Sequence, residues 1–201
     1  MPTFIKTGFW EKTKKGYREW LNLDQFVESK IPAPTYKVFT ALLTQTGGNG
    51  ELYVYEGTPT SIGVTYTIAA NDDNLADFTN IGAPNNNIGT IFMATGTTPA
   101  NWGTYAELAY DTNAPVATVL ENTIGNIWFT YVAEGIYKAN FPIEENRYKI
   151  YVNALPNYNN DYNLIGTYFD ELGVLFITLN SSFTQVDSLL TETPIEIRVY
   201  N

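Results

Sequence analysis

The residue types that carry most enzymatic and metal chemistry are missing from this 201-residue chain, which contains no histidine and no cysteine. A Ser-His-Asp or Cys-His nucleophile site is therefore impossible, and disulfides and cysteine-rich zinc sites are excluded. The glycines form neither a P-loop nor a dinucleotide-binding fingerprint. We expect no catalytic residue, no cofactor and no metal site, and we expect that the protein is not an enzyme.

Carboxylates are the remaining candidates for a metal site, and the densest cluster is Asp72, Asp73 and Asp77. Hard oxygen ligands from one loop suit Ca²⁺, although the spacing is not that of an EF-hand. The same residues are also typical of Asx-type turns whose carboxylates remain solvated. The sequence allows both interpretations.

Glycoside hydrolysis requires two carboxylates at a set separation, one of them with a raised pKa. The body of the chain could supply such a pair from Glu121, Glu134, Glu144, Glu145 and Asp170. Sequence does not show whether any two of them converge, so we assign no hydrolase activity. Four tyrosines either line a sugar-binding surface or form cross-strand pairs, namely Tyr151, Tyr158, Tyr162 and Tyr168.

Charge divides the chain into a basic beginning and an acidic remainder. Residues 1–37 hold seven basic and four acidic residues, whereas the rest holds four basic and 17 acidic residues. The acidic remainder argues against a protein that wraps nucleic acid. No apolar run approaches the roughly 20 residues of a membrane span, and charges interrupt the N-terminal segment where a secretory signal would need an apolar run. We therefore expect neither a nucleic-acid partner nor a membrane partner.

Residues 1–35 form a predicted N-terminal attachment segment, separate from a body of residues 36–201. Residues 21–29 predict a brief helix with a capping-box pair at Asn22 and Gln25, and Pro32 and Pro34 predict a stiff connector after it. Aromatic side chains with basic neighbours make good interface anchors. The predicted partner-binding residues are Phe9, Trp10, Lys14, Lys15, Tyr17, Arg18 and Trp20. Alternatively, these aromatic residues fold back onto the body as part of its core.

From Tyr36 onward the patterns predict β-strands. Apolar and polar residues alternate with period two in residues 64–68, 148–152 and 195–199, as in half-buried strands. Further strands are predicted at 37–44, 51–55, 90–94, 105–110, 115–121, 126–132, 136–141, 164–169 and 172–179. Since no helical pattern lies between them, the fold class is all-β, with an antiparallel β-sandwich or barrel-like body.

Residues 66–108 carry an idiosyncratic motif with an acidic entry ending in Asp77-Phe78, an FTNIGA turn and an FMATGTTPANW core. This segment resembles a small module of structural proteins of tailed bacteriophages. We expect a separate mini-core there, built from Phe78, Ile81, Phe92 and Trp102. Gly82, Gly89 and Gly96 are expected at positions of positive φ or close approach.

A second resemblance is discontinuous. Residues 36–47 and 113–141 resemble the two halves of one β module from gut and marine phage proteins, including the crAss-like phages, and residues 6–27 resemble the leading segment of such proteins. We infer that residues 51–112 form a small β subdomain inserted into this module. A surface loop accepts such an insert at modest entropic cost when its two ends are close.

The resemblance implies a non-enzymatic structural protein of the virion, either a head fibre or a capsid-attached decoration subunit that docks through residues 1–35. The alternative is a tail-associated module, such as a tail fibre, that binds a host receptor or glycan. The implied partners are other virion proteins of the capsid or tail and a host surface glycan. By analogy with fibre proteins, a homo-oligomer is expected, with a trimer favoured.

Overall fold

The computed structural model describes residues 35–142, 147–155, 164–170 and 173–200. The regular structure of these residues consists of twelve β-strands and two 3₁₀ turns, so the all-β prediction is confirmed. Tyr36–Asn201 forms one compact unit. None of the described residues belongs to a helix with the length and apolar character to cross a bilayer. The brief helix predicted at 21–29 lies outside the described residues.

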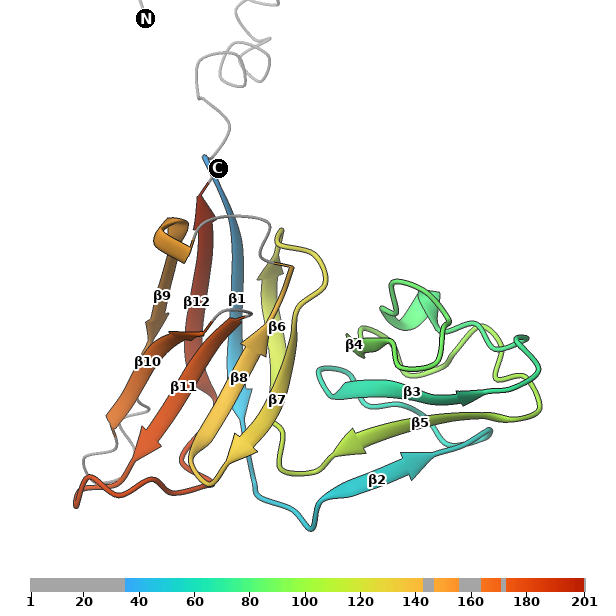
Figure 1. Ribbon diagram of the computed structural model, residues 1–201, viewed down its shortest axis with the longest axis horizontal. Coiled ribbons are helices and arrows are strands. Elements are labelled where there is room, and N and C mark those ends of the chain that lie inside the picture. Colours follow the sequence, from blue (N-terminus) through green and yellow to red (C-terminus); the bar gives the residue numbers. More distant parts are fainter. Residues whose placement is uncertain (1–34, 143–146, 156–163, 171–172, 201) are drawn as a thin grey trace, which may run out of the picture. The chain divides into compact units, whose positions relative to one another are not determined.

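The first sheet has the strand order β6-β1-β12-β9, and every neighbouring pair in it is antiparallel (Figure 1). Its members are β1 (Tyr36–Thr44), β6 (Val116–Asn122), β9 (Ile150–Ala154) and β12 (Thr193–Tyr200). Tyr36 pairs with Tyr200, so β1 begins beside the end of β12. The chain therefore enters and leaves the described body at the same end of this sheet.

The second sheet has the order β10-β11-β8-β7 and is also antiparallel throughout. It contains β7 (Trp128–Ala133), β8 (Ile136–Asn140), β10 (Leu164–Asp170) and β11 (Gly173–Leu179). The two sheets share one core whose largest buried side chains include Phe39, Phe129, Tyr137 and Phe176. Because alternate side chains of both sheets point into this core, the body is a β-sandwich.

A third sheet, here called the inserted sheet, has the order β2-β5-β3-β4. Its strands are β2 (Glu51–Val54), β3 (Thr65–Asn71), β4 (Ile91–Met93) and β5 (Ala106–Asp111). It has its own core, which contains the predicted Phe78, Ile81 and Phe92 with Trp102 packed against them. Phe78 and Trp102 meet edge to face, with ring centroids 5.5 Å apart.

The three glycines of this region have the predicted roles. Gly82 and Gly89 have φ of 108° and 85°. At Gly96, an added Cβ would lie 3.0 Å from the side chain of Ile81 in the mini-core. Glycine is therefore favoured at positions 82 and 89 by the positive φ and at position 96 by the lack of room for a side chain.

The inserted sheet occupies the connection between two paired strands of the sandwich. Thr44 at the end of β1 pairs with Val116 at the start of β6, and Leu43 pairs with Ala117. The chain thus leaves the sandwich and returns to it at neighbouring ladder positions. Such closely spaced ends let the sandwich ladder form around a long insert, since loop closure entropy grows only slowly with length.

Direct hydrogen bonds join the inserted sheet to the sandwich. The N–H of Ala117 donates to the carbonyl of Gly63 at 3.0 Å, and the N–H of Phe129 donates to Thr65 Oγ1 at 3.0 Å. Met93 of β4 is buried within the sandwich core. Strand β6 is an edge strand, so its outward-facing N–H groups could pair with another chain. The bond from Ala117 to Gly63 occupies one of these groups.

All twelve predicted strands are present with bounds shifted by a few residues, and one alternation pattern is partly wrong. The alternation in residues 148–152 predicts that Tyr148 shares one face of a strand with Ile150 and Val152. Instead, Arg147–Lys149 is a 3₁₀ turn, Tyr148 is 80% exposed, and the strand begins at Ile150. A short apolar-polar alternation does not separate a strand from the turn that precedes it.

We predict that Gly63→Ala destabilises the protein more than Gly57→Ala. Both glycines have positive φ, 83° and 85°, so both substitutions carry the left-handed backbone cost of about 1–2 kcal/mol. At Gly63 the new Cβ would also lie 2.0 Å from the carbonyl oxygen of Ala117, whereas at Gly57 nothing lies within 4 Å. Urea unfolding should show at least about 1 kcal/mol of additional loss for Gly63→Ala. Equal losses would contradict a tight junction.

Candidate functional site

A cleft of about 180 Å³ lies where the inserted sheet meets strand β7. All four strands of the inserted sheet contribute to it, together with the connection between β5 and β6. Its lining residues are Glu51, Thr65, Thr67, Ile91, Ala109, Tyr110, Asp111, Ala114, Phe129, Thr130 and Tyr131. No lysine or arginine is among them, so the charged side chains of the cleft are both acidic.

Strand alternation places the acidic and hydroxyl groups on the face of the inserted sheet opposite its core. In β5, Leu108 is buried in the mini-core and Tyr110 packs against that core, so Ala109 and Asp111 belong to the other face. The ladder pairs Glu51 with Asp111 and Thr67 with Ala109, which brings these residues onto that same face. The site is therefore a consequence of register across three strands.

Each carboxylate of the cleft uses one oxygen to hold local structure. Asp111 Oδ1 accepts hydrogen bonds from the backbone N–H and the Nδ2 group of Asn113, at 2.8 and 3.2 Å. Glu51 Oε2 accepts a hydrogen bond of 2.9 Å from the Tyr53 hydroxyl, and this bond raises the pKa of Tyr53. The second oxygen of each carboxylate, and the Thr67 hydroxyl, have no hydrogen-bond partner within the described part of the chain.

A partly buried polar network fixes the other wall of the cleft. The Tyr131 hydroxyl donates to Asp187 Oδ2 at 3.1 Å, and Asp187 Oδ1 accepts from the backbone N–H of Gly135 at 2.7 Å. The Tyr137 hydroxyl lies 2.9 Å from Asp187 Oδ1 and 3.1 Å from Gln45 Oε1. Asp187 therefore bonds to residues of β7, of β8 and of the turn between these two strands.

The two tyrosine hydroxyls of this network are protected from ionisation. Burial and the hydrogen bond to Asp187 raise the pKa of Tyr131, and the charges of Glu134 and Asp111 raise it further. For Tyr137, burial is the largest cause of an even stronger upward shift of the pKa. Tyrosine hydroxyls are neutral at physiological pH, and these shifts move their ionisation further above it, so both hydroxyls act as neutral donors.

The predicted attachment residues Phe9, Trp10, Lys14, Lys15, Tyr17, Arg18 and Trp20 lie outside the described residues. The same holds for Tyr158, Tyr162, Glu144 and Glu145. Tyr151 and Tyr168 lie on β9 and β10 and are 46% and 63% exposed. Tyr168 lines a wide depression of about 470 Å³ together with Tyr148, Ile150, Thr167 and Phe169.

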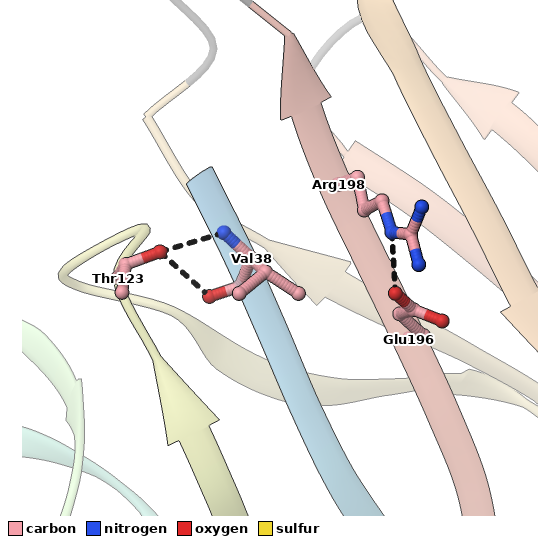
Figure 2. Close-up of polar contacts among 4 residues, drawn as sticks. All are labelled: Val38, Thr123, Glu196 and Arg198. Atoms are coloured by element: carbon pink, nitrogen blue, oxygen red, sulfur yellow. Dashed lines mark hydrogen bonds and ion pairs between the residues drawn. The ribbon is translucent and has the colours of Figure 1, made fainter. Parts of the chain in front are cut away.

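Arg198 engages the exposed ring of Tyr151 from the neighbouring strand. Its guanidinium lies 5.7 Å from the centroid of Tyr151 and 4.9 Å from that of Tyr36, and it forms an ion pair with Glu196. Figure 2 shows this ion pair on β12 and, on the neighbouring β1, the bonds that join Val38 to Thr123. Arg198 and Tyr151 are thus already engaged with each other, as the cross-strand interpretation of the tyrosines expects.

The acidic cluster at 72–77 holds loops in place. Asp73 accepts the backbone N–H groups of Thr104 and Leu75, and Asp77 accepts both the N–H and the hydroxyl of Thr79. These hydrogen bonds lower the pKa of both carboxyls. Across the described residues, no three or more acidic side chains gather where they could hold a metal ion. The geometry matches the Asx-turn interpretation.

Sequence reasoning missed the cleft residues Glu51, Thr67, Asp111 and Tyr131. Glu51 and Asp111 stand at the two ends of the inserted segment, and nothing local marks them as partners. A prediction that the first and last strands of the insert pair with each other would have placed Glu51 opposite Asp111. No other signal in the sequence connects the two residues.

No protein-family model matches the chain, no curated protein matches its sequence, and no solved structure matches its fold. What the geometry establishes is the structural class. The protein is an all-β antiparallel sandwich that carries an inserted four-stranded sheet, with an acidic, hydroxyl-lined cleft at their junction.

We predict that Asp73→Asn makes stability less sensitive to acid. The hydrogen bonds from Thr104 and Leu75 lower the pKa of Asp73 in the folded state, so folding favours its ionised form. That stabilisation is present at neutral pH and is lost as the pH falls below about 4, through the folded-state pKa. Urea midpoints measured between about pH 6 and pH 2 should therefore fall less steeply in the variant.

Asp72→Asn is the matched control for this measurement. It removes the same charge from the same loop, but the Asp72 side chain accepts no hydrogen bond from a described residue. The control should flatten the acid dependence less than Asp73→Asn does, because it leaves both backbone bonds to Asp73 in place. A control that flattens the dependence as much as Asp73→Asn would contradict the role given to the two backbone bonds.

Proposed function

We propose that this protein is a non-enzymatic structural component of a tailed-bacteriophage virion, a head fibre or a capsid-attached decoration subunit. In this proposal residues 1–35 dock to the particle and the acidic β body projects from it. The sequence support is the resemblance of residues 66–108, 36–47 and 113–141 to modules of phage structural proteins. The expected partners are other virion proteins and further copies of the chain, with a trimer favoured by analogy.

One observation carries the structural side of this proposal. The chain enters the body at Tyr36, beside Tyr200, and the inserted sheet begins after Thr44 at the opposite end of the same strand. A nine-residue strand spans about 30 Å. The entry point of the chain into the body and the start of the insert therefore lie at opposite ends of β1, which suits a subunit held at one end and exposed at the other.

A second candidate function is a tail-associated module that binds a host receptor or glycan. The cleft of Glu51, Thr67 and Asp111 favours it, because acceptors and hydroxyls without a partner among the described residues, in a concave site, suit a small polar ligand. The two functions place the protein at different parts of the particle. The position of the subunit in a reconstruction of the particle therefore decides between head and tail.

We predict that removal of residues 1–30 abolishes incorporation into particles and leaves the body folded. Tyr36–Asn201 forms one compact unit, so the truncated chain should keep its cooperative unfolding transition. The measurement is co-sedimentation of purified protein with particles that lack it. A Trp10→Ala/Trp20→Ala double variant should lose most of its binding.

Tyr105→Ala is the control for that experiment, because it removes an aromatic side chain of the body that is 65% exposed. It should sediment with particles as the full-length protein does. Full incorporation of the truncated chain would refute attachment through the N-terminal segment.

A further inference from the structure

We infer that the cleft between the inserted sheet and β7 binds a single neutral sugar residue of a glycan and rejects acidic sugars. This inference rests on the second function proposed above, since it names a ligand and a site for it. It does not depend on attachment through residues 1–35.

The free polar groups match a polyhydroxyl ligand. One oxygen of Glu51 and one of Asp111 have no partner in the described structure, and the two residues are opposite each other in the ladder. Carboxylate oxygens accept strong hydrogen bonds from hydroxyl donors. The Thr67 hydroxyl on the same face can donate and accept. A sugar ring offers several hydroxyls, each of which can donate to a carboxylate oxygen or exchange hydrogen bonds with a threonine hydroxyl.

The edge of β7 adds main-chain groups to this set. In an antiparallel ladder, alternate residues direct their N–H and C=O groups away from the partner strand. Phe129 directs its N–H to Thr65 Oγ1 of the inserted sheet and not to β8. Tyr131 lies two residues further along β7, so its main-chain groups also point away from β8. Both residues line the cleft. A ligand in the cleft therefore meets a strand edge as well as side chains.

Charge and size restrict the ligand further. With two carboxylates and no basic residue in the lining, the cleft repels phosphates, uronic acids and sialic acids. Its volume of about 180 Å³ is below the roughly 300–1,000 Å³ of sites for drug-sized ligands, which suits one small ring rather than a folded peptide segment. An ammonium group can only donate, whereas a sugar hydroxyl both donates to the carboxylates and accepts from the threonine hydroxyls, so we favour the sugar over a cationic side chain.

The walls are held in place before any ligand arrives. Asp187 fixes the Tyr131 hydroxyl, Asn113 holds Asp111, and the Gly63–Ala117 bond holds the inserted sheet to the sandwich. A site whose side chains are already ordered loses less conformational entropy on binding. Weak, millimolar binding of a single sugar is then expected, which repeated subunits on a particle would strengthen through multivalency.

The test is saturation-transfer NMR on the full-length protein with named probes at millimolar concentration. The neutral probes are methyl glycosides of glucose, galactose, mannose and N-acetylglucosamine. The acidic probes are glucuronic acid and N-acetylneuraminic acid, and butylamine represents a cationic side chain. At least one neutral probe should bind, with about tenfold or greater preference over the acidic probes.

The substitutions Glu51→Gln and Thr67→Val should each lower the affinity for the neutral probe about three- to tenfold and leave the fold intact. Glu51→Gln should also reduce the preference for the neutral probe over glucuronic acid, because it removes one of the two carboxylate charges that repel the acid. The matched controls are Glu56→Gln, an exposed acid outside the cleft, and Thr118→Val, an exposed strand threonine of β6. Both controls should bind as the unmodified protein does.

Each contrary result has a distinct meaning. If a neutral sugar binds and neither cleft variant lowers its affinity, the sugar binds elsewhere. That result would overturn the assignment of the cleft as the binding site and leave the glycan-binding function in place. Binding of butylamine alone would overturn the sugar in favour of a cationic ligand. Absence of binding by every probe would overturn the inference, and particle attachment through residues 1–35 would still be judged by its own experiment.

Discussion

The structure depends above all on the pairing of β1 with two strands that are distant from it in sequence. β12 lies along one edge of β1 and β6 along the other, and the whole inserted sheet separates β1 from β6. Phe39, Ala41 and Leu43 of β1 are buried in the sandwich core, so this strand brings the sheet ladder and the core together. Both pairs close long loops, which makes hydrophobic burial the term that must offset the entropy of closure.

The pairing of β1 with β6 also determines the geometry of the cleft. Because β1 and β6 meet at Thr44 and Val116, the inserted sheet leaves and rejoins the sandwich at one place, and its open face comes to lie against the edge of β7. Gly63 and Thr65 secure that contact by hydrogen bonds to Ala117 and Phe129. The result is a concave surface between two separate cores, a common location for ligand sites. The sandwich thus positions a site whose side chains come mostly from the insert.

Local patterns predicted the strands well and the site poorly. The alternation of Ile195, Ile197 and Val199 reflects a physical requirement, since one face of β12 packs in the core while the other meets solvent. Tyr148 kept the same alternation and yet lies in a 3₁₀ turn, because turn residues carry no such requirement. Asp72, Asp73 and Asp77 formed an obvious cluster, but hydrogen bonds to Thr104, Leu75 and Thr79 explain two of them as loop supports.

The sequence by itself determined the all-β class, the positions of the strands, the mini-core around Phe78 and Phe92, and the exclusion of histidine and cysteine chemistry. The strand positions and the excluded chemistry follow from period two and from residue type, which are local, whereas the mini-core is expected from the resemblance of residues 66–108 to a phage module. Only the tertiary structure decided that the body is a sandwich, that Glu51 faces Asp111, and that Asp187 holds Tyr131 beside them. Those contacts join residues far apart in the chain, and their register is set by packing between strands, which no local pattern records.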